Sequence, residues 1–313
     1  MTRRLFLLGL AAFAAGAAGA GARPMEHAYR GAIVMDAATG DVLFADNANE
    51  ISPPASMTKL MTFAVLDDAI RAGRVSLQTV WTVTPADARV GNMRDSTSVH
   101  LRTNERFTVE DLIYAMMIQS ANDAAWMVAH NVAGSVPAFV ALMNAKARSL
   151  GMTRSTFRTP NGFPVPSHRI ADGDLTTPHD FALLCRYLIA HTDILRYTSV
   201  RSRPFGLHER FPPTEMTNHN HLLGKVPGVD GLKTGFTNGA GFCLSATAHR
   251  GGRRLIVVMM DCPDARSRDL AVARLLERGF ATLPAVRLEP LAPPAAPSAA
   301  PGAPPLVHFS VPG

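Results

Sequence analysis

The sequence predicts an α+β fold, in which the two ends of the chain form one antiparallel sheet and a lobe of helices is inserted between them. Segments of strand length and character occur near the start of the chain and again after residue 229. Apolar residues at helical spacing fill most of the middle. Hydrophobic residues make up 47% of the 313 residues and charged residues 18%, a balance typical of a globular chain with a sizeable core.

The N-terminal segment has the pattern of an export signal. Arg3 and Arg4 precede an apolar stretch, residues 5–18, that is too short for a comfortable membrane span. Small residues follow, and Ala20-Gly21-Ala22 fits a cleavage site. We therefore expect a signal peptide at residues 1–22 and an exported, extracytoplasmic protein, with Sec and twin-arginine export both open. No later segment is long and apolar enough to span a bilayer, so we expect no integral span in the mature chain.

The first elements are two strands and a helix. Residues 32–36 and 42–45 are expected to be strands around the turn Ala37-Ala38-Thr39-Gly40. Pro53 and Pro54 then interrupt the chain. A helix is expected over residues 56–71, where apolar residues recur at helical spacing: Leu60, Phe63, Leu66 and Ile70. The stretch from there to about residue 103 is rich in loop residues and poor in strand signals.

The middle helices have recognisable ends. Thr108, with Asp111 three residues later, is expected to cap a helix that stops at Ser120. Further helices are expected over residues 123–134 and 137–150. Thr177-Pro178 has the cap and first-turn proline of another helix, which runs to about residue 190.

Strands return at the end of the chain. Residues 229–235, 241–249 and 255–262 are expected to be consecutive strands, with hairpin-turn signals at Asn238-Gly239 and Gly251-Gly252. A last helix is expected over residues 265–278, closing at Gly279. We expect one folded domain over residues 27–282. Residues 283–313 are rich in proline and alanine, cannot bury enough to fold, and are expected to be disordered.

Cysteine usage and charge exclude several classes of function. Cys185, Cys243 and Cys262 do not make a disulfide framework; a Cys243–Cys262 bridge and buried free thiols both remain open. There is no Cys/His cluster at zinc spacing, and we expect no cofactor or metal. The net charge is +6, but no basic run is interleaved with aromatic residues, so we expect no nucleic-acid partner.

Three short motifs carry the candidate chemistry: Ser56-Met57-Thr58-Lys59, Ser120-Ala121-Asn122 and Lys233-Thr234-Gly235. Each motif alone occurs by chance in many proteins, so the case for a catalytic site depends on where the motifs lie in the predicted fold. Ser56 and Lys59 share one face at the start of a helix. Serine is a weak nucleophile until a base takes its proton, and a neutral lysine can be that base if burial and nearby cations lower its pKa.

Lysine is scarce in this chain, which otherwise uses arginine. It occurs only at Lys59, Lys146, Lys225 and Lys233. Arginine does not give up its proton in a protein, whereas lysine can, so a retained lysine is a candidate for proton transfer. Lys233 would supply the nearby cation and an anchor for a carboxylate. Gly235 leaves room for a ligand along the strand edge.

The ordered motifs resemble those of the serine-type D-alanyl-D-alanine carboxypeptidases, the low-molecular-weight penicillin-binding proteins of peptidase family S11. The resemblance covers about residues 32–280. It includes the segments 36–43, 54–62, 120–124, 218–223 and 229–235, in the order of the family. It implies a DD-peptidase/β-lactamase-like fold and removal of the terminal D-alanine from peptidoglycan stem peptides ending in D-Ala-D-Ala, with β-lactams as inhibitors.

The same resemblance implies a role for each candidate residue. Ser56 would be acylated, Lys59 would be the general base, and Ser120 would relay a proton to the leaving amine. The remaining roles concern substrate binding and the oxyanion: Asn122 would orient the substrate and Lys59; Lys233, Thr234 and Arg268 would meet the substrate carboxylate; Gly235 precedes Phe236, whose backbone N–H would form the oxyanion hole with that of Ser56.

The chain departs from the family pattern at three positions. Phe236 and His219 stand where some members carry histidine and arginine, and Asn104 replaces a common glycine at a position that favours a left-handed turn. A D,D-endopeptidase would use the same residues and is the main alternative, followed by a wall-binding pseudoenzyme. A class A β-lactamase needs a suitably placed glutamate, but only Glu209 and Glu215 lie between Ser120 and Lys233.

Overall fold

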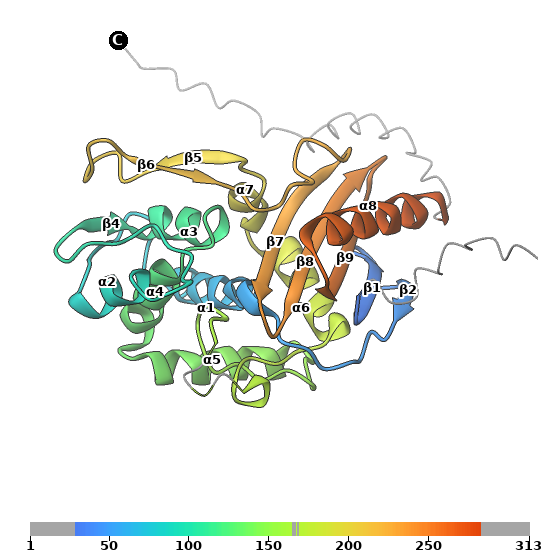
Figure 1. Cartoon of the computed structure of the whole chain (residues 1–313), viewed down its shortest axis with the longest axis horizontal. Helices are drawn as coiled ribbons and strands as arrows, with labels where there is room; N and C mark the ends of the chain where they lie inside the picture. The colour runs from blue at the N-terminus through green and yellow to red at the C-terminus, as the bar shows by residue number, and fades with distance from the viewer. Residues whose placement is uncertain (1–28, 165–166, 168, 283–313) are drawn as a thin grey trace, which may run out of the picture.

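The computed structural model describes residues 29–164, 167 and 169–282 (Figure 1). The expected signal peptide, residues 1–22, and the proline- and alanine-rich tail, residues 283–313, lie outside the described residues. Among the residues that are described, no single helix is long and apolar enough to cross a membrane, although one pair of helices, α4 (Asn122–Ala133) and α5 (Val136–Ser149), bent by 88°, passes that test together.

A five-stranded antiparallel sheet joins the two ends of the described chain, which confirms the predicted topology. Its strand order is β2-β1-β9-β8-β7. The strands are β1 (Gly31–Asp36), β2 (Val42–Asp46), β7 (Val229–Thr237), β8 (Gly241–Arg250) and β9 (Arg253–Cys262). β1 pairs with β9 in the register Ala32↔Met259 and Val34↔Val257. The segment that holds the third motif, β7, is therefore an edge strand.

Side chains of this sheet point alternately to its two faces, and each face is covered by a hydrophobic core. Ile33 and Met35 of β1 belong to the core on the side of the helical lobe. Ala32 and Val34 belong to a smaller core beneath α8 (Ala265–Thr282), which packs on β8 and β9 (Figure 1). Burying each aliphatic side chain of this kind contributes roughly 1.5–3 kcal/mol relative to exposure.

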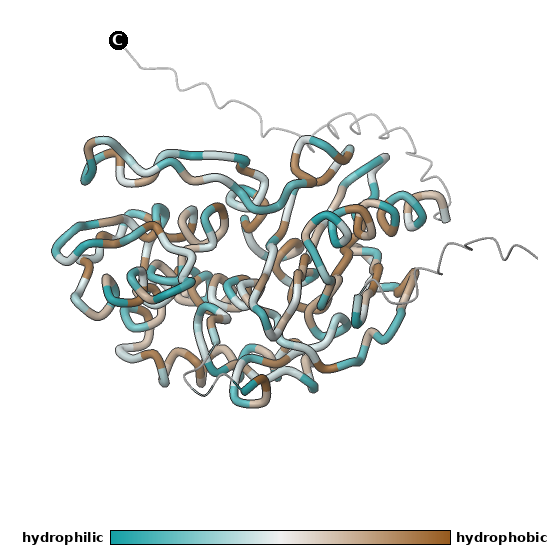
Figure 2. The backbone as a smooth tube through the Cα atoms, viewed as in Figure 1, coloured by the Kyte–Doolittle hydropathy of each residue, from teal (hydrophilic) through white to brown (hydrophobic). Residues whose placement is uncertain are grey.

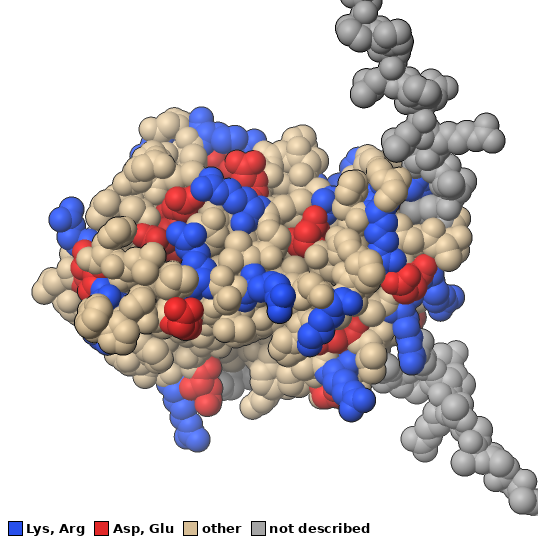
Figure 3. All heavy atoms as spheres, turned by 90° about the horizontal axis from the view of Figure 1, so that it is seen from above, with Lys and Arg blue, Asp and Glu red and all other residues tan. Residues whose placement is uncertain are grey.

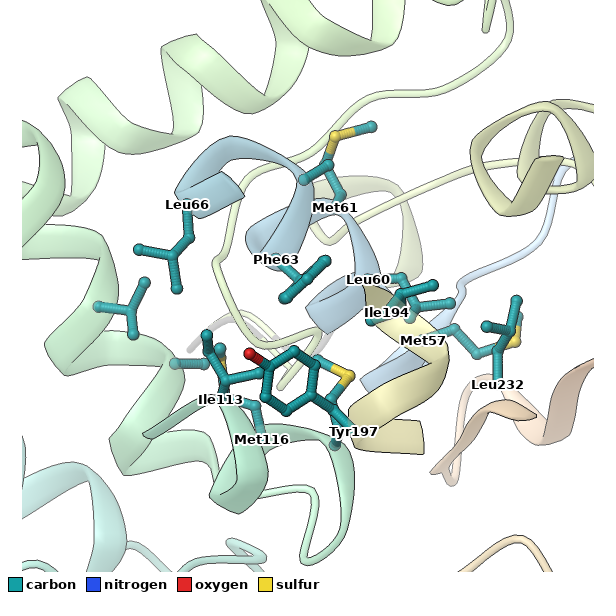
Figure 4. Packing of buried hydrophobic residues seen from close by; sticks show 14 of the residues in the cluster. Met57, Leu60, Met61, Phe63, Leu66, Ile113, Met116, Ile194, Tyr197 and Leu232 are labelled. Atoms are coloured by element: carbon teal, nitrogen blue, oxygen red, sulfur yellow. The ribbon is translucent and has the colours of Figure 1, made fainter. Parts of the chain in front are cut away.

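The helical lobe surrounds α1 (Lys59–Arg71), which packs against α3 (Val109–Met117), α4 (Asn122–Ala133), α5 (Val136–Ser149) and α6 (Pro178–His191). Figure 4 shows the side chains around this central helix. Leu60, Phe63 and Leu66 of α1 belong to the same core as Ile113 of α3 and Tyr197 of α7 (Ile194–Thr198), and the rings of Phe63 and Tyr197 have centroids 5.8 Å apart. Figure 2 shows hydrophobic and hydrophilic residues mixed along the backbone of the lobe. The central helix α1 is buried over the consecutive residues 59–66, because other helices surround it.

Three of the predicted helix ends are confirmed. Thr108 and Asp111 form a reciprocal capping box at the start of α3. The Thr177 side chain accepts a hydrogen bond from the Asp180 N–H at the start of α6, with Pro178 in the first turn. Gly134 ends α4 with φ 75°. These local interactions fix where each helix enters and leaves the core.

Three segments differ from the sequence prediction. The first turn of the expected helix at residue 56 is a 3₁₀ turn, η2 (Ala55–Thr58), which leads into α1. The expected loop before residue 103 contains β3 (Val80–Thr82) and α2 (Pro85–Gly91); β3 pairs with β4 (Arg106–Thr108). α8 continues past Gly279, where a Cβ would lie 2.7 Å from Leu255 Cδ1, so this glycine allows close helix–sheet contact and does not end the helix.

Residues 202–217 form a hairpin that the sequence analysis missed. It consists of β5 (Ser202–Phe205) and β6 (Thr214–Thr217) and extends beside the helical lobe (Figure 1). A short 3₁₀ turn, η3 (Ile170–Asp172), lies in the connection before α6. On the face shown in Figure 3, basic and acidic side chains lie beside one another, so the net positive charge does not form a single basic field there.

The three cysteines are buried free thiols. Cys243 belongs to the core on the lobe side of the sheet, and Cys262 belongs to the core beneath α8. Their side chains therefore lie on opposite faces of two paired strands. This resolves the alternative left open above: the two residues are not bridged, and burial raises the pKa of each thiol to about 12.

Candidate active site

The candidate nucleophile follows a tightly packed turn. Ala55, which precedes Ser56, has φ 48°, a conformation that few residues other than glycine adopt. Two glycines enclose this turn: a Cβ at Gly162 would lie 1.9 Å from the Ala55 carbonyl oxygen, and one at Gly235 would lie 2.5 Å from that of Pro54. Because neither glycine carries a side chain, the loop after α5 and the strand β7 both approach Ser56 closely.

Lys59 lies one turn beyond Ser56 and is completely buried. Its Nζ is 2.8 Å from Ser56 Oγ, 2.7 Å from Asn122 Oδ1 and 2.8 Å from the Asn161 carbonyl oxygen. A neutral amine has two N–H groups and one lone pair. Two of its three partners can only accept a hydrogen bond, which leaves the lone pair for the Ser56 hydroxyl. This arrangement fits a neutral lysine that takes a proton from serine.

The electrostatic environment of Lys59 favours the same neutral form. Burial first, and then the charge of Lys233, hold the pKa of Lys59 well below its usual value of 10.5. The carboxylates of Asp123 and Asp174 act in the opposite direction. Desolvation dominates because the ammonium group would lose its hydration in the interior.

The second motif lies in the tight connection between α3 and α4. Ser120 is buried, with φ 62°. Asn122 is the first residue of α4, and its Nδ2 donates to Ser96 Oγ at 3.1 Å while its Oδ1 accepts from Lys59. The Ser96 contact thus fixes which end of the Asn122 amide faces Lys59.

Lys233 connects the third motif to the second. Its Nζ donates to Ser120 Oγ at 3.0 Å and to the Thr234 carbonyl oxygen at 3.0 Å. Burial, followed by the charge of Arg268, lowers the pKa of Lys233 to about 7. Lys233 and Ser120 thus form one hydrogen-bonded pair and Lys59 and Ser56 another, and the charge of Lys233 acts on Lys59, although these residues lie up to 177 positions apart along the chain.

The edge strand β7 forms one wall of the site. Gly235 lies against the nucleophile turn, where its added Cβ would be 3.2 Å from the Ser56 backbone nitrogen. Phe236, the next residue, is half exposed, lines the cleft and stacks on Phe242 of β8 with ring centroids 4.1 Å apart. An edge strand has a row of backbone groups free of sheet partners, which a peptide substrate could use. Thr234 is buried in the same strand.

Arg268 lies on α8, on the opposite face of the sheet, and is not among the described residues that line the cleft beside Ser56. It is buried, its Nε and Nη2 both donate to Asp269 Oδ1 at 2.9 and 2.7 Å, and its Nη1 lies 3.4 Å from the Cys243 carbonyl oxygen. Its charge acts on Lys233, as noted, and on His219. Burial and then the charge of Lys233 lower the pKa of His219 to about 4, so this histidine is neutral near pH 7.

The cleft beside Ser56 has a volume of about 910 Å³. Ser56, Asn122 and Phe236 line it, together with residues 93–95 on one side and part of the loop 162–174 on the other. No glutamate is among the described residues that line it, and Glu209 and Glu215 lie on the β5–β6 hairpin. No group of described His, Cys, Asp or Glu side chains could hold a metal ion.

Sequence reasoning missed three contributors. Asn161 acts through its backbone carbonyl, and the Pro160-Asn161-Gly162 sequence signals only a turn. Ser96 stands in a loop with no motif. Asp174 is buried and accepts from Thr58 Oγ1 at 2.7 Å and from the backbone N–H groups of residues 158 and 159 at 2.7 and 2.9 Å. Asp174 thereby holds the loop that presents the Asn161 carbonyl to Lys59.

Known proteins of one family resemble this chain over most of its length. The family model described as D-alanyl-D-alanine carboxypeptidase matches residues 18–264. D-alanyl-D-alanine carboxypeptidase DacC from Escherichia coli is 38% identical over 79% of this chain and 60% of its own length. DacF from Bacillus subtilis is 29% identical over 82% of this chain and 63% of its own length. The chain thus spans about three-fifths of the length of these curated relatives.

Solved structures show the same fold. Penicillin-binding protein D2 from Listeria monocytogenes, in its ampicillin-bound form, has a TM-score of 0.70 and 30% identity, covering 81% of this chain and 97% of that one. Penicillin-binding protein 6B from Escherichia coli has a TM-score of 0.73 and 33% identity, covering 84% and 80%. With the family match over most of its length, the chain belongs to the D-alanyl-D-alanine carboxypeptidase family, peptidase family S11.

Proposed function

We propose that the protein is a serine-type D-Ala-D-Ala carboxypeptidase, which removes the terminal D-alanine from peptidoglycan stem peptides. The observation that carries this proposal is the hydrogen-bonding pattern of Lys59. Nζ lies within 2.8 Å of Ser56 Oγ and of the carbonyl oxygens of Asn122 and Asn161; in the neutral form that burial favours, its two N–H groups donate to the two carbonyl oxygens and its lone pair accepts from Ser56. The family match supports the same activity.

In the proposed acylation step, Ser56 Oγ attacks the carbonyl carbon between the two terminal D-alanines and passes its proton to Lys59. The developing oxyanion is stabilised by the backbone N–H groups of Ser56 and Phe236. The C–N bond then breaks. The proton held by Lys59 passes through the Ser120 hydroxyl to the leaving D-alanine amine, and Lys233 holds that hydroxyl by a hydrogen bond. In the second step water attacks the acyl carbon, Lys59 takes a proton from the water and returns it to Ser56 Oγ as the ester bond breaks, and the shortened peptide is released.

Recognition of the free carboxylate is assigned to Lys233, Thr234 and Arg268. Lys233 lies on the edge strand β7, and the charge of the buried Arg268 acts on it from the α8 side of the sheet, whereas an internal peptide bond offers no charge to match these cations. Each hydrogen bond to a charged group contributes roughly 1.5–3 kcal/mol, so losing one reduces kcat/KM by about ten- to a hundredfold.

The same site is proposed to be acylated by penicillins, which carry a carboxylate and a reactive amide in comparable positions. The ampicillin-bound Listeria relative supports this assignment by its similarity in fold. We also propose that residues 1–22 direct export by the Sec or the twin-arginine route, that residues 27–282 form the catalytic domain, and that the protein acts in the cell wall outside the cytoplasm.

The test compares three substrates: a pentapeptide ending in D-Ala-D-Ala, its C-terminal amide, and a cross-linked muropeptide dimer. A carboxypeptidase cleaves the free acid strongly in preference to the other two. The preference narrows in Thr234→Ala and Arg268→Ala, because each removes a group that meets the carboxylate. Equal cleavage of the acid and the amide, or preference for the dimer, would favour a D,D-endopeptidase. Absence of cleavage together with absence of penicillin labelling would favour a wall-binding pseudoenzyme.

A further inference from the structure

We propose that Arg210, in the loop of the β5–β6 hairpin, is a positioning residue for the lysine base. It acts through residues 96–101 and Asn122 and does not touch the reacting atoms. This inference rests on the proposed function, because a positioning role for Arg210 requires that Lys59 is the base. It assigns a purpose to a buried cation that none of the three motifs contains.

Arg210 is fully engaged with the segment beside the site. Its side chain is only 4% exposed. Nε and Nη2 donate to the two carboxylate oxygens of Glu105 at 2.8 and 2.6 Å. Nη1 donates to the Val99 carbonyl oxygen at 2.6 Å and to Thr214 Oγ1 at 2.9 Å, and Nη2 donates to the His100 carbonyl oxygen at 2.9 Å. The five N–H donors of the guanidinium group therefore have five acceptors.

The same segment is held from its other side by Asp123, the residue after Asn122. The Asp123 carboxylate accepts from the backbone N–H of Val99 at 3.4 Å and of Leu101 at 3.0 Å. Arg210 thus binds the carbonyl groups and Asp123 binds the N–H groups of one short stretch. His100, in its middle, has φ 51°, an unfavourable conformation that such a clamp can maintain.

This stretch leads directly to the amide that faces Lys59. The Thr97 carbonyl accepts from the Asn122 N–H at 2.9 Å, and Ser96 Oγ accepts from Asn122 Nδ2 at 3.1 Å. Because the amide nitrogen is committed to Ser96, the amide oxygen is presented to Lys59 at 2.7 Å. If Ser96 moved away, the amide could rotate and bring its own N–H groups against those of Lys59. The lone pair of the lysine would then lose its orientation toward Ser56.

Arginine is required at this position by the geometry of its partners. Two carbonyl oxygens and two carboxylate oxygens surround one planar group, and the fork of a guanidinium matches them. A lysine at residue 210 would keep the charge near Glu105 but, as a point donor, could not hold both carbonyl groups. Arg210→Lys therefore weakens the hold on the two carbonyl groups but still places a cation beside the buried Glu105 carboxylate.

The experiment measures acylation by a fluorescent penicillin in Arg210→Lys, Ser96→Ala and the double variant. Stopped-flow data separate the acylation rate constant from the dissociation constant of the first complex. We expect each single change to lower the rate constant about tenfold, as for one lost hydrogen bond, with the dissociation constant retained. The double variant should lose no more than about tenfold, because both residues act through the same amide.

Arg250→Lys is the matched control. Arg250 also donates to both oxygens of a glutamate, Glu277, at 2.9 and 2.8 Å, and to the Pro227 carbonyl at 2.8 Å, but it lies at the far end of the sheet from Ser56. The Arg250→Lys variant should be acylated by the penicillin at the wild-type rate. If Arg210→Lys fails to fold, as judged by circular dichroism, Glu105→Gln replaces it, since it weakens the same clamp while leaving Arg210 in place.

Two results would overturn the inference. The first is wild-type acylation in a folded Arg210→Lys or Glu105→Gln variant. The second is a double variant in which the two losses multiply to about a hundredfold, which would show that the residues act independently. Failure of the wild type to be acylated at Ser56 would instead contradict the proposed function.

Discussion

Replacing Lys59 by arginine separates the charge of this residue from its ability to transfer a proton. Lys59 Nζ lies 2.8 Å from Ser56 Oγ, and in the described structure it is the nitrogen base hydrogen-bonded to that hydroxyl. A guanidinium group has a pKa above 12 and keeps its proton. Lys59→Arg thus preserves a cation next to Ser56 and removes the base.

The expected loss is large. A positioned general base contributes about 10²–10⁴-fold to a rate, and each factor of ten corresponds to about 1.36 kcal/mol of activation free energy. Removing it should therefore raise the barrier to acylation by roughly 3–5 kcal/mol. Raising the pH should not restore the rate of Lys59→Arg, because the arginine does not deprotonate in the accessible range.

The assay is the second-order rate of acylation by a fluorescent penicillin, with the melting temperature measured on the same samples. Lys146→Arg is the matched control. Lys146 is another largely buried lysine, whose Nζ donates to Asp68 and to the Tyr187 hydroxyl, both at 2.8 Å, outside the site. The Lys146→Arg variant should be acylated at the wild-type rate. Acylation of a folded Lys59→Arg variant within about threefold of the wild type would refute the reasoning, because Lys59 would then act only as a fixed charge.

Three further predictions follow from the packing and the pKa shifts. Gly162→Ala should slow acylation at least about tenfold, because its Cβ would collide with the Ala55 carbonyl oxygen. Gly73→Ala is the control: Gly73 has a similar φ of 68° but nothing within 4 Å of an added Cβ, so this variant should be acylated like the wild type. Equal acylation rates in the two variants would contradict the role of close packing at Gly162. Arg268→Gln should move the basic limb of the kcat/KM profile to higher pH, because the charge of Arg268 helps lower the pKa of Lys233 to about 7; an unmoved limb would show that Lys233 does not set it. Because the unfolded lysine keeps its proton up to about pH 10.4, the free energy of unfolding should rise between pH 7 and 10, and urea titrations should show a flatter rise in Lys233→Met.

The parts of the fold that the sequence predicted are those set by local rules. The caps at Thr108 and Thr177 and the helix end at Gly134 depend on residues within one turn, so their patterns are readable in the chain. The central strands were predicted because apolar runs and turn dipeptides bound them. A shared sheet for the two ends of the chain is predicted by strands at both ends around a helical middle, but the specific pairing of β1 with β9 comes only from the structure.

The segments that were missed depend on tertiary contacts. The β5–β6 hairpin contains Pro204 in its first strand and Pro212-Pro213 at the end of its loop, and prolines weaken a strand signal. Arg210 fixes this loop through contacts with residues more than a hundred positions away in sequence. Gly279 has the sequence signature of a helix end, but in the structure its lack of a side chain allows α8 to pack closely on β9. Propensity alone cannot distinguish these uses.

The candidate site divides in the same way. Side chains of Ser56, Lys59 and Ser120 were predicted because their chemistry is specific to their residue types. The Asn161 carbonyl and the Ser96 hydroxyl were not, because backbone groups carry no sequence signal and a lone loop serine has many uses. Both determine how the lysine nitrogen is oriented, which a list of motifs does not describe.

The central claim is that Ser56 is the nucleophile of an acyl-enzyme. The most direct test incubates the protein with a labelled penicillin, digests it and locates the label by mass spectrometry. We predict one adduct per chain, on the peptide that contains Ser56, and no adduct in Ser56→Ala, whose melting temperature should match that of the wild type. A label on another residue, or labelling that persists in Ser56→Ala, would contradict the claim.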